Sequence, residues 1–201
     1  MIFDECTSGF RKTFGGLHLD YGVEPDIATF GKTLGNGYAI NAIVGRAEVM
    51  QAAQDTFISS TFWTERIGPT AALATLDVMQ AEDAPARIHE IGLKVRSIWQ
   101  SLGIEAGLEV VPAGVPSIGT YSITGFDAIV TKTFITQEML KRGFIAGNAL
   151  YASIEHTDEI LDKYGAHLLD VFQAISETDG SDDLSRRLDA GPAQSGFQRL
   201  A

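Results

Sequence analysis

The sequence predicts an α/β protein, and two kinds of pattern support this fold class. Short apolar runs that end at polar or glycine-rich positions indicate buried strands at residues 2–3 and 27–30 and a further strand at residues 42–45. Apolar residues at helical spacing indicate long helices over residues 70–80 and 85–102. Strands followed by helices in this order are typical of the closing part of an α/β domain.

The composition changes after the second long helix, which predicts a smaller α+β domain. Short apolar runs separated by Gly and Pro between residues 104 and 135 indicate strands joined by turns, and one such strand is expected at residues 128–130. Helical spacing returns at residues 136–142 and 157–175. The acidic tail from Glu177 is expected to be mobile or loosely packed.

We place the boundary between the two predicted domains after residue 82. Residues 1–82 form the first domain and residues 83–201 the second. Within the first domain, a short helix is expected at residues 46–53.

The bulk composition excludes several classes of protein. The 201 residues are 45% hydrophobic and 20% charged, as in ordinary soluble globular proteins, and the net charge is −11. A surface that binds nucleic acid needs clustered Lys and Arg, so no nucleic-acid partner is expected. No apolar run of membrane-spanning length occurs and no signal peptide precedes Asp4, so no membrane partner is expected. The single cysteine, Cys6, fits a reducing compartment, so a cytoplasmic location is expected.

Lys32 is the first candidate for chemistry. It follows the predicted strand at residues 27–30 and lies in a glycine-rich stretch with Gly31, Gly35 and Gly37. A lysine amine can form a Schiff base with an aldehyde, which is how pyridoxal phosphate (PLP) is attached to its enzymes. The alternative is a solvated loop lysine, the common fate of this residue type. A nucleotide-binding P-loop does not fit, because the upstream glycine of that motif is absent.

Asp4 is the second candidate, because it ends the predicted strand at residues 2–3. A carboxylate in this position can hold the pyridine nitrogen of PLP in its protonated form, which keeps the ring able to accept electrons. The alternative is an aspartate that opens a turn. Asp4 and Lys32 both follow strands, and ligands of open α/β sheets bind beyond the carboxyl ends of the strands.

A third candidate is the polar run at residues 59–61, which ends in Thr61. Its hydroxyl and N–H groups could bind the phosphate of a cofactor. The alternative is a helix N-cap, for which Ser and Thr are favoured, and both interpretations can hold together.

The order of several motifs resembles the class III aminotransferases of PLP fold type I, in particular members similar to glutamate-1-semialdehyde aminomutase. Lys32 lies 28 residues after Asp4, a spacing that matches this family. Residues 137–143 and 156–157 resemble the small domain of the family, and the resemblance extends roughly from Ile2 to Ile175. The motifs that carry it in the first domain are D-E-x-x-x-G-F-R at residues 4–11, G-V-x-P-D at 22–26, G-K-x-x-G-x-G at 31–37 and G-R at 45–46.

This resemblance implies a role for each candidate residue. Lys32 would be the Schiff-base lysine and proton shuttle, and Asp4 would bind the pyridine nitrogen. Cys6 stands where the family usually has a small apolar residue packed against the cofactor ring, and a thiol is a small hydrophobe. Thr61 matches a threonine that reaches the PLP phosphate of the neighbouring subunit, so a homodimer is implied. The substrates implied are a small-molecule amino donor and a keto or aldehyde acceptor.

Three functional alternatives stay open at this point. The first is a class III transaminase, and the second is an aminomutase that uses the same machinery. The third is a non-catalytic fragment, because family members are more than twice this length and the chain looks like the C-terminal half of one, incomplete for catalysis. A metal site is not expected, because the four histidines (His18, His89, His156 and His167) are scattered and Cys6 is alone.

Overall fold

A computed structural model describes residues 1–194 of the chain. The chain divides into two compact units, Met1–His89 and Glu90–Ala201, and each is described by itself. Helix α3, Ala84–Ala106, contains the point of division. No helix among residues 1–194 combines the length and apolarity that a membrane crossing requires.

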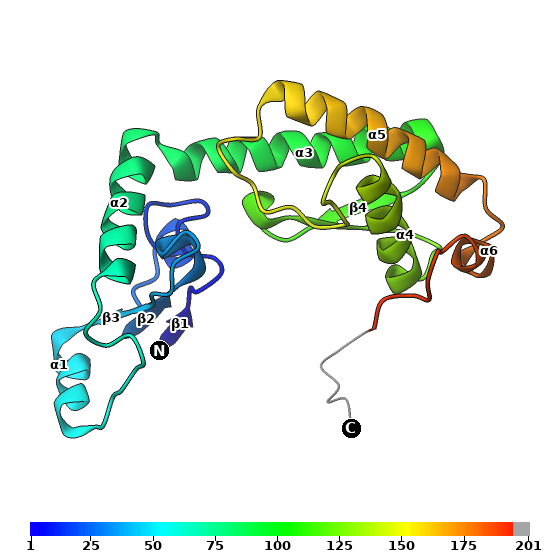
Figure 1. Ribbon diagram of the computed structural model, residues 1–201. Helices are drawn as coiled ribbons and strands as arrows, with labels where there is room; N and C mark the ends of the chain where they lie inside the picture. The colour runs from blue at the N-terminus through cyan, green and yellow to red at the C-terminus, as the bar shows by residue number, and fades with distance from the viewer. Residues whose placement is uncertain (195–201) are drawn as a thin grey trace. The chain divides into compact units, whose positions relative to one another are not determined.

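The first unit is built on a three-stranded sheet in the order β1-β2-β3 (Figure 1). Strand β1, Ile2–Asp4, is parallel to β2, Ile27–Phe30, and β3, Ala42–Gly45, is antiparallel to β2. The parallel pairing sets Asp4 opposite Thr29, so the carboxyl ends of β1 and β2 lie at the same edge. The helical elements of this unit are η1 Leu17–Tyr21, η2 Lys32–Leu34, α1 Ala47–Met50, η3 Gln51–Asp55 and α2 Ile67–Ala81.

The three predicted strands are present, but the burial predicted for residues 2–3 and 27–30 is only partly correct. Ala28 and Phe30 of β2 are buried with Leu34 and Met79, the last from α2. Ile2 of β1, in contrast, is 69% exposed, and Ile43 of β3 is 57% exposed. A short apolar run identifies a strand, but it does not say whether one face or both faces are covered within the unit.

From the sequence, residues 59–61 are a candidate helix N-cap. Helix α2 begins later, and a different residue, Glu65, binds its first N–H groups. The carboxylate of Glu65 accepts hydrogen bonds from the N–H groups of Ile67 and Gly68, both at 2.8 Å. These bonds satisfy two of the donors that the first turn of a helix leaves unpaired. Thr61 lies in the exposed turn before this cap and does not serve as the N-cap.

The second unit packs helices against a two-stranded antiparallel sheet. Strand β4, Val110–Ala113, pairs with β5, Thr120–Ile123. Trp99 Nε1 of α3 donates a hydrogen bond at 2.8 Å to Tyr164 Oη of α5, Asp158–Ser176, and Figure 1 shows the two helices side by side. The remaining helices are η4 Pro116–Ile118, α4 Ala128–Lys141 and α6 Ser181–Arg186.

The predicted strand at residues 128–130 is wrong, because these residues form the first turn of α4. Asp127 precedes them with an extended backbone, and its carboxylate accepts hydrogen bonds from the N–H groups of Ile129 and Val130 at 2.9 Å. An aspartate in this position is a strong helix N-cap. The helix expected at 136–142 therefore starts eight residues earlier, whereas the helices expected at 85–102 and 157–175 are confirmed.

The tail predicted to be mobile from Glu177 is ordered over its described part. Residues 181–186 form α6, and its Leu184 is fully buried in the core of the second unit. Gln137 of α4 holds the segment that follows: its Nε2 donates to Arg187 O at 3.2 Å, and its Oε1 accepts from Asp189 N at 2.7 Å. Residues 195–201 of the predicted mobile tail lie outside the described residues.

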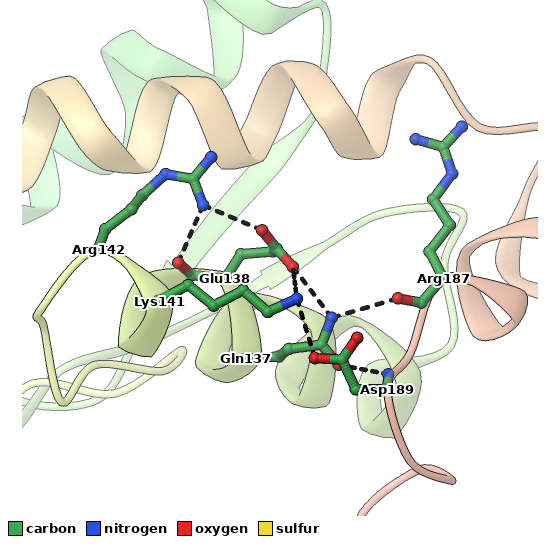
Figure 2. Close-up of polar contacts among 6 residues, drawn as sticks. All are labelled: Gln137, Glu138, Lys141, Arg142, Arg187 and Asp189. Atoms are coloured by element: carbon green, nitrogen blue, oxygen red, sulfur yellow. Dashed lines mark hydrogen bonds and ion pairs between the residues drawn. The ribbon is translucent and has the colours of Figure 1, made fainter.

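Glu138 is the charged centre of this attachment. Figure 2 shows Lys141 Nζ between two carboxylates, 2.9 Å from Glu138 Oε1 and 2.9 Å from Asp189 Oδ2. Arg142 Nη1 donates to Glu138 Oε2 at 3.0 Å. Burial raises the pKa of Glu138, but the hydrogen bonds from Gln137, Lys141 and Arg142 outweigh it and lower the pKa to about 2.

We expect Leu184→Ala to destabilise the protein by about 2–5 kcal/mol, because it leaves a cavity in a closed core. The free energy of unfolding in urea, followed by circular dichroism, measures this loss. Leu140→Ala, at an exposed position of α4, is the matched control and should change stability by less than about 0.5 kcal/mol. Equal losses in the two variants would contradict the placement of α6.

We also expect Glu138 to contribute to acid sensitivity. Its folded pKa of about 2 lies below the ordinary 4.5, so its contribution is present above pH 4.5 and is lost as the pH falls from 4.5 towards 2. Glu138→Gln should make the decline in unfolding free energy over this range shallower. An unchanged slope would show that Glu138 is not responsible.

Candidate active site

Asp4 lies where the carboxyl ends of β1 and β2 meet. Its Oδ1 accepts a hydrogen bond from Cys6 N at 3.0 Å and one from Thr29 Oγ1 at 3.4 Å. These bonds favour the ionised carboxylate, so the Cys6 N–H first, then the Thr29 hydroxyl and the Lys32 charge, hold the pKa of Asp4 below its usual value. Asp4 is therefore an anion at neutral pH, and Lys32 is close enough for its charge to act on it.

Lys32 begins η2 directly after Gly31, which follows β2. Its backbone has φ +40°, in the left-handed region that side-chain-bearing residues rarely adopt. Its side chain is exposed, and Nζ donates a hydrogen bond to Thr7 Oγ1 at 2.5 Å. Residues held in such conformations concentrate at functional sites, because the surrounding structure must compensate for their strain.

The backbone beside Lys32 passes very close to its neighbours. A Cβ added to Gly31 would overlap Asn41 Oδ1 and would lie 3.4 Å from Cys6 Sγ. A larger residue at position 31 would therefore require the Asn41 side chain to move. Cys6 is half-buried, with its Sγ 3.9 Å from Thr29 Oγ1, so the thiol lies between the two strand ends.

The neighbouring acid, Glu5, has the opposite environment to Asp4. It is only 2% exposed, and its carboxylate accepts a short hydrogen bond from the Ser8 hydroxyl and one from His18 N at 3.0 Å. His18 Nδ1 lies 2.9 Å from Glu5 Oε1. Burial raises the pKa of Glu5, but these hydrogen bonds lower it overall. Glu5 thus connects the loop after β1 to η1.

The four candidate residues are not all brought together. Asp4, Cys6 and Lys32 share the edge formed by β1 and β2. Thr61 lies in an exposed turn and, within residues 1–194, makes no hydrogen bond with the other three. The described part of the chain also groups no three His, Cys, Asp or Glu side chains in a way that could hold a metal ion.

Two hydroxyl residues of this edge were missed by the sequence reasoning. Thr29 bonds to Asp4, and Thr7 bonds to Lys32. Thr29 could have been found, because aligning the starts of the two predicted strands, at Ile2 and Ile27, sets it opposite the acid. Thr7 could not, because its position depends on the fold of the loop between the strands.

Comparison with known proteins identifies the class to which this α/β chain belongs. The family model described as "Aminotransferase class-III" matches residues 1–176. The chain belongs to this family, and the resemblance inferred from the motifs is confirmed.

Several relatives carry transaminase or aminomutase names. A 2'-deamino-2'-hydroxyneamine transaminase of Streptomyces kanamyceticus is 33% identical over 177 residues, covering 85% of this chain and 44% of that protein. A 3-aminobutyryl-CoA aminotransferase of Cloacimonas acidaminovorans is 39% identical over 117 residues, covering 58% of this chain and 28% of that protein. A glutamate-1-semialdehyde 2,1-aminomutase of Neisseria meningitidis serogroup B is 28% identical over 200 residues, covering 88% and 45%. The chain spans less than half the length of these relatives.

Solved structures show the same fold. A FumI protein of Sphingopyxis sp. MTA144, in a PLP internal aldimine form, has a TM-score of 0.81 at 22% identity and covers 91% of this chain and 46% of its own. An S-selective transaminase from Arthrobacter sp. has a TM-score of 0.75 at 21% identity, with coverages of 89% and 45%. The predicted fold class, part of a PLP fold type I domain followed by a smaller α+β domain, is confirmed.

We expect Glu5→Ala to loosen the loop between β1 and η1, because it leaves the buried groups of His18 and Ser8 without their acceptor. Such a loss costs about 1–3 kcal/mol. Tryptic cleavage after Arg11 and Lys12 should therefore be faster in the variant, as measured by peptide mass spectrometry. Glu24→Ala, at an exposed position, is the control, and equal cleavage in the two variants would contradict this role.

Proposed function

We propose that this chain is part of a PLP-dependent aminotransferase that moves an amino group between an amino donor and a keto or aldehyde acceptor. The observation that carries the proposal is the placement of an ionised Asp4 and of Lys32 at the carboxyl ends of two neighbouring parallel strands. Family membership supports it, and two similar solved structures are a PLP internal aldimine form and a transaminase with PLP bound.

The residues at this edge fit the cofactor by their chemistry. An anionic carboxylate suits a protonated ring nitrogen, and a lysine amine suits an aldehyde. Glycine at position 31 places no side chain of its own next to Lys32, and the Cys6 thiol offers a small apolar surface. We assign Asp4, Cys6, Lys32 and Thr61 to cofactor binding and Lys32 to catalysis.

Each residue has a separate task in this proposal. When bound, PLP supplies an electron-poor ring that stabilises negative charge at the substrate Cα. Asp4 stays charged at neutral pH and so keeps the ring nitrogen protonated. Lys32 Nζ attaches the cofactor and carries the proton that leaves the substrate Cα. Cys6 packs beside the ring and excludes water from it.

Thr61 has a task only in an assembly of two chains. Its exposed turn lies away from the hydrogen bonds of Asp4 and Lys32, so we infer that it donates to the cofactor phosphate of a second copy. A homodimer follows from this assignment. The exposed apolar side chains near Thr61, which include Phe57, Phe62 and Trp63, support burial of this turn against another surface.

Location and other partners form a further part of the proposal. The unpaired Cys6 favours a cytoplasmic location, where thiols stay reduced. The net charge of −11 disfavours binding to nucleic acid, so small-molecule substrates are the partners we propose.

An intramolecular aminomutase is a second candidate, favoured by the glutamate-1-semialdehyde 2,1-aminomutases among the relatives. It would use the same residues and keep the amino group on one carbon skeleton. A non-catalytic fragment is a third candidate. The chain covers only 44% of the S. kanamyceticus transaminase, and Ile2 and Ile43 expose apolar surface on the sheet. We propose that the chain is incomplete for catalysis by itself.

We expect treatment with PLP and then borohydride to fix the cofactor on Lys32, as located by peptide mass spectrometry. Lys32→Ala should lose this label, whereas Lys132→Ala, at an exposed lysine of α4, should keep it. Asp4→Asn should weaken PLP binding about tenfold or more, because a charged hydrogen-bond partner is lost.

Labelling at lysines other than Lys32 would refute the assignment of the catalytic amine. Turnover of alanine or glutamate by the isolated chain would exclude the non-catalytic alternative. If an amino aldehyde is converted and its amino group does not pass to a second molecule, the result favours the aminomutase.

A further inference from the structure

We propose that Thr7 is a positioning residue for the Lys32 amine, holding Nζ at the carboxyl ends of β1 and β2. This inference rests on the proposed function of Lys32. Thr7 lies in the loop after β1, and its Oγ1 accepts the hydrogen bond that Lys32 Nζ donates at 2.5 Å. The contact joins residues 25 positions apart, so it depends on the fold of the loop.

Both neighbours of Thr7 are anchored, which fixes the place of its hydroxyl. On one side, Cys6 N donates to Asp4 Oδ1. On the other side, Ser8 Oγ donates to the buried carboxylate of Glu5, and Gly9 N donates to Glu5 O at 2.8 Å. Thr7 is thus held on a rigid segment, whereas Lys32 reaches it through a flexible side chain. The hydroxyl therefore positions the amine rather than the reverse.

The neutral character of this partner matters for the chemistry of the amine. Four other lysines bind carboxylates: Lys12, Lys94, Lys141 and Lys163. A carboxylate in contact would hold an amine strongly in its charged form, which is no nucleophile. A hydroxyl restrains the position of Nζ with a weaker preference for the charged form and can also donate to a neutral amine.

The backbone conformation of Lys32 also supports the positioning role of Thr7. Its left-handed conformation at φ +40° turns the chain just after β2, and a Cβ on the preceding Gly31 would lie against Asn41 and Cys6. A loop lysine whose side chain is simply in solvent requires neither a strained backbone nor a hydrogen-bond acceptor that is held in place. The combination of strain, close approach and a fixed hydroxyl indicates that the position of Nζ is specified.

The test compares the reactivity of Lys32 in the full chain with that of the other lysines. Brief treatment with a small amount of acetic anhydride labels free amines, and peptide mass spectrometry gives the Lys32 label relative to Lys94 and Lys163. Thr7→Val keeps the shape of the side chain but removes the acceptor. The Lys32 ratio should then rise about three- to tenfold, because the hydrogen bond that holds the amine against the loop is lost and Nζ is free to react.

Two further variants separate positioning from a general change of structure. Thr7→Ser keeps the hydroxyl, so its ratio should stay within about twofold of the native value, below the effect of a lost hydrogen bond. Thr33→Val is the matched control, because Thr33 adjoins Lys32 and its Oγ1 has no hydrogen-bond partner among residues 1–194. An unchanged or lower ratio in Thr7→Val, or equal ratios in Thr7→Ser and Thr7→Val, would overturn the proposal.

The same samples distinguish this proposal from the proposed function. If PLP and borohydride fail to label Lys32 in the native chain while the acetylation ratios behave as expected, the role of Lys32 in cofactor attachment is wrong and the Thr7 contact stands. If Lys32 carries the cofactor label and its acetylation ratio in Thr7→Val equals that of the native chain, the positioning role alone is wrong.

Discussion

The buried carboxylate of Glu5 is the interaction on which the first unit depends. A charged group almost without solvent contact is costly unless it is fully hydrogen-bonded. Glu5 meets this condition by collecting donors from Ser8 and from the backbone and ring of His18, which lie on both sides of a long loop. The loop between β1 and β2 is thereby closed on itself, although it contains little regular structure.

The adjacent residues Asp4 and Glu5 therefore have different roles. Glu5 points inward and organises the loop, whereas Asp4 stays exposed at the end of β1. Both have lowered pKa values, but for different reasons: Glu5 overcomes burial with many donors, and Asp4 relies first on the Cys6 N–H. Because side chains alternate along an extended segment, successive residues can face the interior and the site.

The sequence was informative wherever local chemistry decides the structure. Strand ends at Asp4 and Phe30 and the spacing to Lys32 followed from apolar runs, glycines and family motifs. The error at residues 128–130 arose because an apolar triplet suits a strand or a helix, and the cap at Asp127 decided between them. Leu184 and the contacts of Gln137 were missed because they join segments about fifty residues apart, which no local pattern reveals.

The conformation of Lys32 has a consequence for the evolution of this family. A left-handed backbone costs about 1–2 kcal/mol for a residue with a Cβ, and glycine avoids this cost. Selection for abundance or solubility alone would therefore favour replacement of Lys32 by glycine. A lysine at this position therefore has a folding cost that a glycine would not have, and copies of the gene in which its side chain has no use should lose this residue early.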